Sequence, residues 1–353
     1  MGMLTSAKRI FIKPLAVPAV ARLLRSSIDS TVSLFMMHRF DSPDLGVSGH
    51  PPRALARSLA YLRKERFELV SLADLVAGRA LDRKRPQIVF TVDDGYSDFM
   101  DVALPVFAEF DCPVSVFVAT GVVDGQCWYW NDVISFAFAN TSHRAISLAV
   151  DGVPVEYTWQ DADGARRAGE RFNELLKTVR HEARLEALRQ MTERLSVDVP
   201  SVPTRQYAPM SWDDARRCAA SGLVTFGPHS VNHPVLSNMR GSDASSEIVE
   251  SWRRLQQIDV ATVPVFVYPY GAYSKREVDA LATTDLAGAL TTEHRYSSPD
   301  AFAAKHGRRR FTIPRLTYSD DRLEFLQAAS GVERIKLGIR DGRGGWQTQG
   351  LAV

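Results

Sequence analysis

Cysteine is scarce in this chain. The 353 residues contain three cysteines, Cys112, Cys127 and Cys218, which are too few and too widely spaced for a disulfide framework or a thiolate metal cluster. A reducing compartment is therefore the simpler expectation.

An excess of charge of one sign is also missing. Lysine and arginine total 43 against 41 acidic residues, so the chain lacks the basic excess that is typical of nucleic-acid-binding proteins. The hydrophobic content of 45% is enough for a sizeable core, built as one large domain or two smaller ones, and excludes general disorder.

No long apolar run is present in the basic segment at residues 1–30. Its short apolar stretches are interrupted by lysine, arginine and two prolines. The segment has neither a signal-peptide core with a cleavage site nor the roughly 20 apolar residues of a membrane span. We expect a cytoplasmic protein in which this segment packs on the domain as a helix, with peripheral contact to an anionic membrane as the alternative.

Short apolar runs alternate with helical stretches over residues 31–126. This order of strand, helix, strand, helix and strand predicts a parallel sheet or a barrel of βα units. The expected strands cover 31–40, 86–92 and 113–121, and the expected helices cover 52–65 and 102–110.

The pattern changes at Cys127. A helix at its start, a hairpin with Asp151-Gly152 as its turn, and one long charged helix from about 161 to 195 predict an insertion or cap over 127–205. The βα pattern resumes over 206–330, and 331–353 is expected to be a loose tail.

Two neighbouring carboxylates, Asp93 and Asp94, follow the strand that ends at Val92. They repel each other, and each is costly to dehydrate beside an apolar core unless a cation or a proton relieves it. A surface turn at Asp94-Gly95 is the alternative interpretation.

A pair of histidines follows another predicted strand. His229 and His233 are four residues apart, so one helical turn would point both imidazoles the same way, although Pro234 favours a loop with a single turn. Alone, such a pair is more often a chance occurrence or a surface turn than a metal site.

The conjunction of the two clusters is more informative than either one. Barrel active sites are built from the loops at the carboxyl ends of strands, where both clusters are expected. Asp94 with the two imidazoles would leave open positions on a zinc-type ion, and Asp93 would be free to take a proton from water.

These motifs resemble those of the polysaccharide deacetylases with a NodB homology domain, known as carbohydrate esterase family 4. Residues 91–95 correspond to its Thr-Phe-Asp-Asp-Gly motif, and 229–234 to its paired-histidine motif. Residues 265–274, "VFVYPYGAYS", resemble the exopolysaccharide-associated branch. The resemblance covers about residues 31–330 and implies an α/β fold, a deformed (β/α) barrel with an inserted helical and hairpin subdomain.

The resemblance also implies roles for individual residues. Asp93 is the catalytic base, and Asp94, His229 and His233 hold one divalent metal ion, for which zinc is favoured. Pro269 and Tyr270 line the substrate groove, and the backbone N–H of Tyr270 helps to hold the oxyanion.

Two positions depart from the family pattern. Val267 stands where many members carry an arginine that orients the catalytic aspartate, so either another group orients Asp93 or none does. The stretch 311–319 lacks the usual histidine that acts as general acid. His38, at the end of a predicted strand, is our expected replacement, and His294 is the second candidate.

Two further features allow two interpretations each. Trp128 and Trp130 could stack on sugar faces, but tryptophans in an insertion more often anchor it, which is what we expect here. The basic stretch 305–311 either meets the phosphate of a linked sugar or forms a solvated loop.

The sequence therefore predicts a metal-dependent hydrolase that removes N-acetyl groups from an amino-sugar glycan or a glycolipid intermediate of surface polysaccharide synthesis. The expected partner is an N-acetylated saccharide, and no nucleic acid is expected. One alternative is hydrolysis of a linear or cyclic non-sugar amide on the same barrel. Another is a non-catalytic glycan-binding scaffold, against which the intact Asp93 argues.

Overall fold

The structure is a computed structural model that describes residues 31–79 and 85–331. The basic segment expected at 1–30, and all but the first residue of the tail expected at 331–353, lie outside the described residues. Among the helices of the described ranges, none combines the length and the apolar character needed to cross a bilayer.

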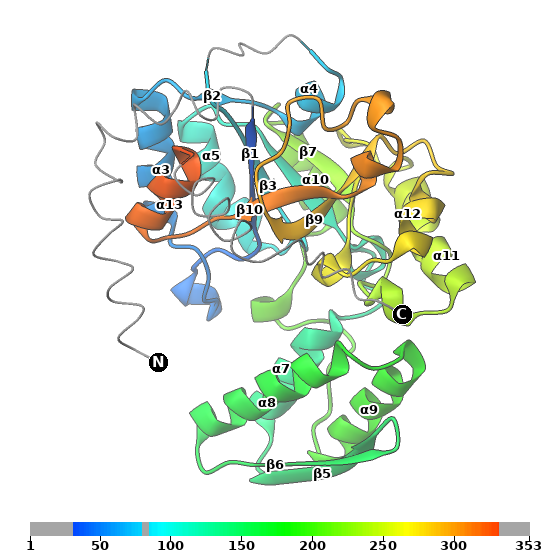
Figure 1. The fold of residues 1–353 in the computed structure, drawn as a ribbon. Coiled ribbons are helices and arrows are strands. Elements are labelled where there is room, and N and C mark those ends of the chain that lie inside the picture. Colours follow the sequence, from blue (N-terminus) through cyan, green and yellow to red (C-terminus); the bar gives the residue numbers. More distant parts are fainter. Residues whose placement is uncertain (1–30, 80–84, 332–353) are drawn as a thin grey trace, which may run out of the picture.

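A nearly closed barrel of parallel strands forms the larger part of the molecule (Figure 1). Around the barrel the order is β7-β4-β3-β1-β10-β9-β8, and the short β2 (Glu68–Leu69) pairs with the start of β3. The deformed (β/α) barrel expected from the sequence is therefore confirmed. The barrel strands are β1 (Val32–Met37), β3 (Gln87–Val92), β4 (Val114–Val118), β7 (Val224–Pro228), β8 (Val265–Val267), β9 (Gly288–His294) and β10 (Ile313–Thr317).

The seam of the barrel lies between β7 and β8. There the pairing in the described chain is reduced to a parallel bridge between Phe226 and Thr262. Every residue of β1, β3 and β4 is buried, which explains why these strands are continuous apolar runs rather than alternating ones.

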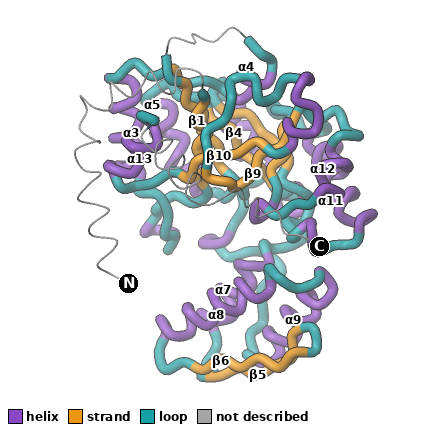
Figure 2. The backbone as a smooth tube through the Cα atoms, viewed as in Figure 1, coloured by secondary structure: helices purple, strands orange, loops and turns teal. Residues whose placement is uncertain are grey.

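Helices surround the strands on the outside of the barrel (Figure 2). In α3, the buried residues recur at helical spacing, so one face packs on the sheet. Capping boxes at Ser211 and Ser274 fix the starts of α10 and α12. The outer helices are α3 (Pro52–Lys64), α4 (Leu72–Val76), α5 (Leu104–Glu109), α10 (Trp212–Ala219), α11 (Gly241–Leu255), α12 (Lys275–Leu281) and α13 (Arg322–Ala329). The short α6 (Thr120–Val123) is buried and follows β4 at the carboxyl end of the barrel.

The insertion forms a separate layer beside the barrel (Figure 1). It contains α7 (Trp130–Asn140), the antiparallel hairpin of β5 (Ala145–Val150) and β6 (Val153–Thr158), α8 (Ala162–Leu176) and α9 (His181–Arg194). The hairpin prediction is confirmed, since Asp151 and Gly152 both adopt positive φ, at 48° and 81°, as a tight hairpin turn requires. The inner face of the hairpin packs on α8 and α9 in a core of their own.

The single helix expected from 161 to 195 is wrong. The chain breaks after α8 and returns as α9, although no glycine or proline marks the break. Arg184 in α9 donates from Nε to the carbonyl of Leu176, at 2.9 Å, and so satisfies a carbonyl at the end of α8. A break here lets Phe172 and Met191 share one core, whereas one straight helix would carry α9 away from it.

Gly227 allows β7 to approach its neighbours closely. A Cβ at this position would lie 2.4 Å from the Phe117 ring and 2.9 Å from the carbonyl oxygen of Val265. We expect Gly227→Ala to lower the free energy of unfolding by about 1–3 kcal/mol because the barrel must shift to accommodate the methyl group. Denaturant unfolding measures the change.

Gly241→Ala is the matched control. Its Cβ would meet the flexible Arg276 side chain at 3.2 Å, at the start of α11, so the stability should be unchanged or higher. Equal stability of the two variants would contradict a tight approach at Gly227.

Candidate active site

The predicted site residues meet at the carboxyl ends of the barrel strands. Asp93 and Asp94 follow β3, His229 follows β7, and Pro269 and Tyr270 follow β8. Parallel strands deliver their carboxyl ends to one face, so residues that are far apart in the sequence become neighbours.

Asp94, His229 and His233 place three metal-binding atoms together. Asp94 Oδ1 lies 3.4 Å from His229 Nε2 and 3.2 Å from His233 Nε2, and the two imidazole nitrogens are 3.1 Å apart. Ligands at about 2.0–2.1 Å from a tetrahedral ion are about 3.3 Å from one another, so the spacing fits one divalent cation.

A hydrogen bond fixes the tautomer of His229. Its Nδ1 lies 2.8 Å from the carbonyl oxygen of Val267, which can only accept, so Nδ1 carries the proton. The Nε2 lone pair of the neutral ring then points toward Asp94 and His233, as a metal ligand requires.

Burial makes the other two ligands suited to a cation. Burial would raise the pKa of Asp94, but the imidazoles of His233 and His229 hold that pKa well below its ordinary value. Burial lowers the pKa of His233, which favours the neutral, metal-binding ring. Asp94 Oδ1 is buried and accepts no hydrogen bond from the described residues, and a cation would satisfy it.

Glu247 on α11 holds the loop between the two histidines. Its carboxylate accepts from the backbone N–H groups of Val231 and Asn232, at 2.8 Å each, and from the Asn232 side chain at 2.7 Å. Ser230 Oγ accepts from the N–H of His233. The spacing of the ligands therefore rests on a hydrogen-bonded loop rather than on a helical turn.

Arg315 on β10 orients Asp93. Its guanidinium donates to both carboxylate oxygens, at 2.8 and 2.7 Å, and both side chains are buried. Burial alone would raise the pKa of Asp93, but the Arg315 guanidinium outweighs it and holds that pKa below its ordinary value. Asp93 is therefore a fixed, ionised carboxylate beside the three metal-binding residues.

Arg315 was not predicted from the sequence. The family pattern places the orienting arginine near Pro269, where the chain has Val267, whereas the arginine of this chain comes from β10. The signal was present in "FTIPRLTYS", because an arginine within a buried strand requires a partner of opposite charge.

The two candidate general acids lie in different surroundings. His38 directly follows β1, is 46% exposed, and places Nε2 3.8 Å from Asp93 Oδ2. His294 is the last residue of β9, and its Nδ1 accepts a hydrogen bond from the backbone N–H of Thr317.

Tyr270 covers one side of His233. The two ring centroids are 4.7 Å apart, and the tyrosine has a left-handed backbone at φ 58°. Its hydroxyl donates to Asn131 Oδ1 at 3.0 Å. Pro269, just before it, is buried.

The two tryptophans anchor the insertion, as expected. Trp128 and Trp130 are 8% and 7% exposed, and their indole N–H groups donate to the carbonyls of Pro200 and His233. Neither ring offers an open face for a sugar.

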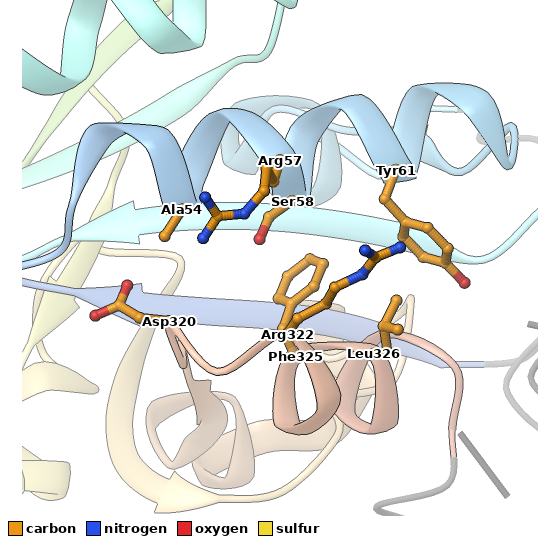
Figure 3. Close-up of a pocket in the computed structure, with 8 residues that line it drawn as sticks. All are labelled: Ala54, Arg57, Ser58, Tyr61, Asp320, Arg322, Phe325 and Leu326. Carbon is orange, nitrogen blue, oxygen red and sulfur yellow. The ribbon is translucent and has the colours of Figure 1, made fainter. Parts of the chain in front are cut away.

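Two other features lie away from Asp93. The basic stretch 305–311 precedes β10, so it lies at the opposite end of the barrel from the carboxyl ends of the strands. A hollow lies between α3 and α13 (Figure 3). It is lined mainly by Arg57, Ser58, Tyr61, Arg322, Phe325 and Leu326.

Residues 80–289 match the sequence pattern of a family described as polysaccharide deacetylase. The chain belongs to the polysaccharide deacetylase family. The members of this family are hydrolases that act on amide bonds, which agrees with the carboxylate and histidine cluster at the strand ends. No curated protein sequence matches this family member significantly.

Solved structures of other deacetylases share the fold. The Streptococcus pyogenes deacetylase PplD, in complex with acetate, is 15% identical and has a TM-score of 0.52, covering 85% of this chain and 98% of its own. IcaB from Ammonifex degensii is 16% identical with a TM-score of 0.50, covering 85% and 97%. A polysaccharide deacetylase from Bacillus cereus is 12% identical with a TM-score of 0.50, covering 85% and 69%.

We expect Arg315→Leu to lower the free energy of unfolding by about 3–5 kcal/mol, because it leaves Asp93 buried without its partner. Chemical denaturation of metal-free protein measures the loss. Arg253→Leu is the control, since Arg253 forms an exposed pair with Glu250, and exposed ion pairs contribute little to stability.

The double variant Asp93→Asn/Arg315→Leu should recover part of the lost stability, because no unpaired charge remains. A double variant less stable than Arg315→Leu would show that Arg315 acts through its other contacts instead.

Proposed function

We propose that the chain is a zinc-dependent deacetylase of an N-acetylated amino sugar, acting on a glycan or glycolipid intermediate of surface polysaccharide synthesis. One observation carries the proposal. The donor atoms of Asp94, His229 and His233 converge beside Asp93, which Arg315 holds in a single orientation.

The donor set favours a hydrolytic metal centre. Two imidazoles and one carboxylate suit zinc and leave coordination positions open, unlike a closed structural site. When bound, the ion supplies a Lewis acid for the acetamide carbonyl and lowers the pKa of the attacking water.

Residues of the chain would carry out the proton transfers and bind the oxyanion. Asp93, ionised and held by Arg315, takes the proton of the water that attacks the acetamide carbonyl. The backbone N–H of Tyr270 donates to the developing oxyanion. His38 gives a proton to the nitrogen as the carbon–nitrogen bond breaks, which releases acetate and a free amino sugar.

The position of His38 supports its role as the acid. It lies 3.8 Å from Asp93 and remains half exposed, so it can exchange protons with solvent. His294 accepts a backbone hydrogen bond through Nδ1, which restricts its ring.

The substrate class is tested by acetate release from a panel. The panel contains N-acetylglucosamine oligomers of increasing length, a lipid-linked N-acetylhexosamine, and a cyclic imide as the non-sugar amide. Release from the saccharides with none from the imide supports the proposal, and the reverse would move the function to small amides.

We also propose that the protein acts in the cytoplasm, in contact with the membrane surface. Contact with a cytoplasmic membrane surface rests on the basic, apolar sequence of residues 1–30. Co-sedimentation of the full chain with anionic and neutral vesicles tests it, and equal recovery from both would reject it.

Asp93→Asn should retain the metal and lower the deacetylation rate by roughly 100 to 10,000-fold, because the nearly isosteric amide cannot accept the proton. Elemental analysis and steady-state kinetics measure the two effects. The triple alanine variant of Asp94, His229 and His233 is the control that should lose the metal, and near-normal turnover by Asp93→Asn would assign the base elsewhere.

His38→Ala should slow turnover and remove the loss of rate at basic pH that occurs when a general-acid histidine loses its proton, with the metal content unchanged. The pH profiles of kcat for the two proteins measure this. His294→Ala should have the smaller effect, and the opposite ranking would transfer the role to His294.

A further inference from the structure

The start of α7 contacts the candidate site through four consecutive side chains. These contacts reach three different loops of the barrel, which follow β3, β7 and β8. Tyr129 donates to the carbonyl of Asp94, Trp130 donates to the carbonyl of His233, Asn131 accepts from the hydroxyl of Tyr270, and Asp132 accepts from the hydroxyl of Tyr96.

Three of the contacted residues have a strained backbone. Asp94, His233 and Tyr270 adopt φ values of 72°, 53° and 58°, in the left-handed region that residues with side chains rarely occupy. Such conformations persist when surrounding contacts hold them, and two of these residues belong to the metal-binding trio.

The phenol groups are suited to this task. A phenol hydroxyl can both donate and accept, and Tyr129 and Tyr270 each donate to an oxygen that can only accept. The Tyr129 ring also meets the His233 ring edge to face, with centroids 5.1 Å apart.

The segment is fixed from the side of the insertion. The Arg184 guanidinium carbon lies 5.0 Å from the centre of the Trp130 ring, and Arg184 is buried where α8 ends and α9 begins. The position of Trp130 therefore depends on how the insertion folds.

We propose that Tyr129 and Trp130 are positioning residues that hold the metal-binding residues Asp94 and His233 in place, and that Asn131 holds Tyr270 against the His233 ring. The insertion is then a component of the metal centre, not only a cover. This inference rests on the metal site of the proposed function and on no assumption about the substrate.

Trp130→Phe and Trp128→Phe form a matched pair of tests. Both indoles are buried to the same degree and donate one N–H to a carbonyl, but the Trp128 bond goes to Pro200 and not to a ligand loop. The dissociation constant of Zn²⁺ is measured for the full chain in competition with a chromophoric chelator, beside the stability of the metal-free protein.

Trp130→Phe should weaken zinc binding by about 10-fold or more, as supporting groups around metal ligands typically do, while Trp128→Phe stays within about 2-fold of the wild type. Tyr129→Phe, which removes one hydroxyl and keeps the ring, should also weaken binding about 10-fold. Unchanged affinity in both site variants, or an equal loss in Trp128→Phe, would overturn the inference.

The result separates this inference from the proposed function. A wild-type chain that binds zinc but releases no acetate from any saccharide would reject the function and leave the metal-affinity comparison valid. A metal-dependent deacetylase whose Trp130→Phe and Tyr129→Phe variants bind zinc normally would reject the inference alone.

Discussion

The separation of two adjacent negative charges is the constraint on which the candidate site depends. Asp93 and Asp94 are consecutive and both lie at the buried end of β3, where neither would stay ionised without help. Arg315 neutralises the first, and the cation expected between Asp94 and the two neutral imidazoles would neutralise the second. Because each carboxylate has its own positive partner, one can remain a free base while the other binds a metal.

The same arginine also joins the strands. Arg315 on β10 reaches past β1 to Asp93 and Thr91 at the end of β3, and its Nε donates to the carbonyl of Thr291 on β9. The orientation of the base therefore depends on the register of these strands. An arginine buried this deeply is costly unless all its donors find partners, so the barrel and the site constrain each other.

The sequence predicted the features that follow from local pattern. The barrel, the hairpin turn at Asp151-Gly152 and the meeting of Asp94 with His229 and His233 all depend on apolar periodicity, on turn chemistry, or on the rule that parallel strands end on one face. Arg315 within a buried strand indicated a charged partner, but the sequence did not identify that partner, because Asp93 lies 222 residues away and only the strand register brings the two together. The break between α8 and α9 has no glycine or proline, and a side chain from the following helix stabilises it.

The contacts of Tyr129 and Trp130 with the ligand loops have a thermodynamic consequence. Linkage is reciprocal. If the insertion strengthens the binding of an ion by some free energy, the bound ion must stabilise the docking of the insertion on the barrel by the same amount. The hairpin of β5 and β6 lies at the far end of the insertion and supplies no ligand (Figure 2). Because α7 shares one core with the hairpin, a substitution that loosens the packing of the hairpin would then also weaken the binding of a cation at the site.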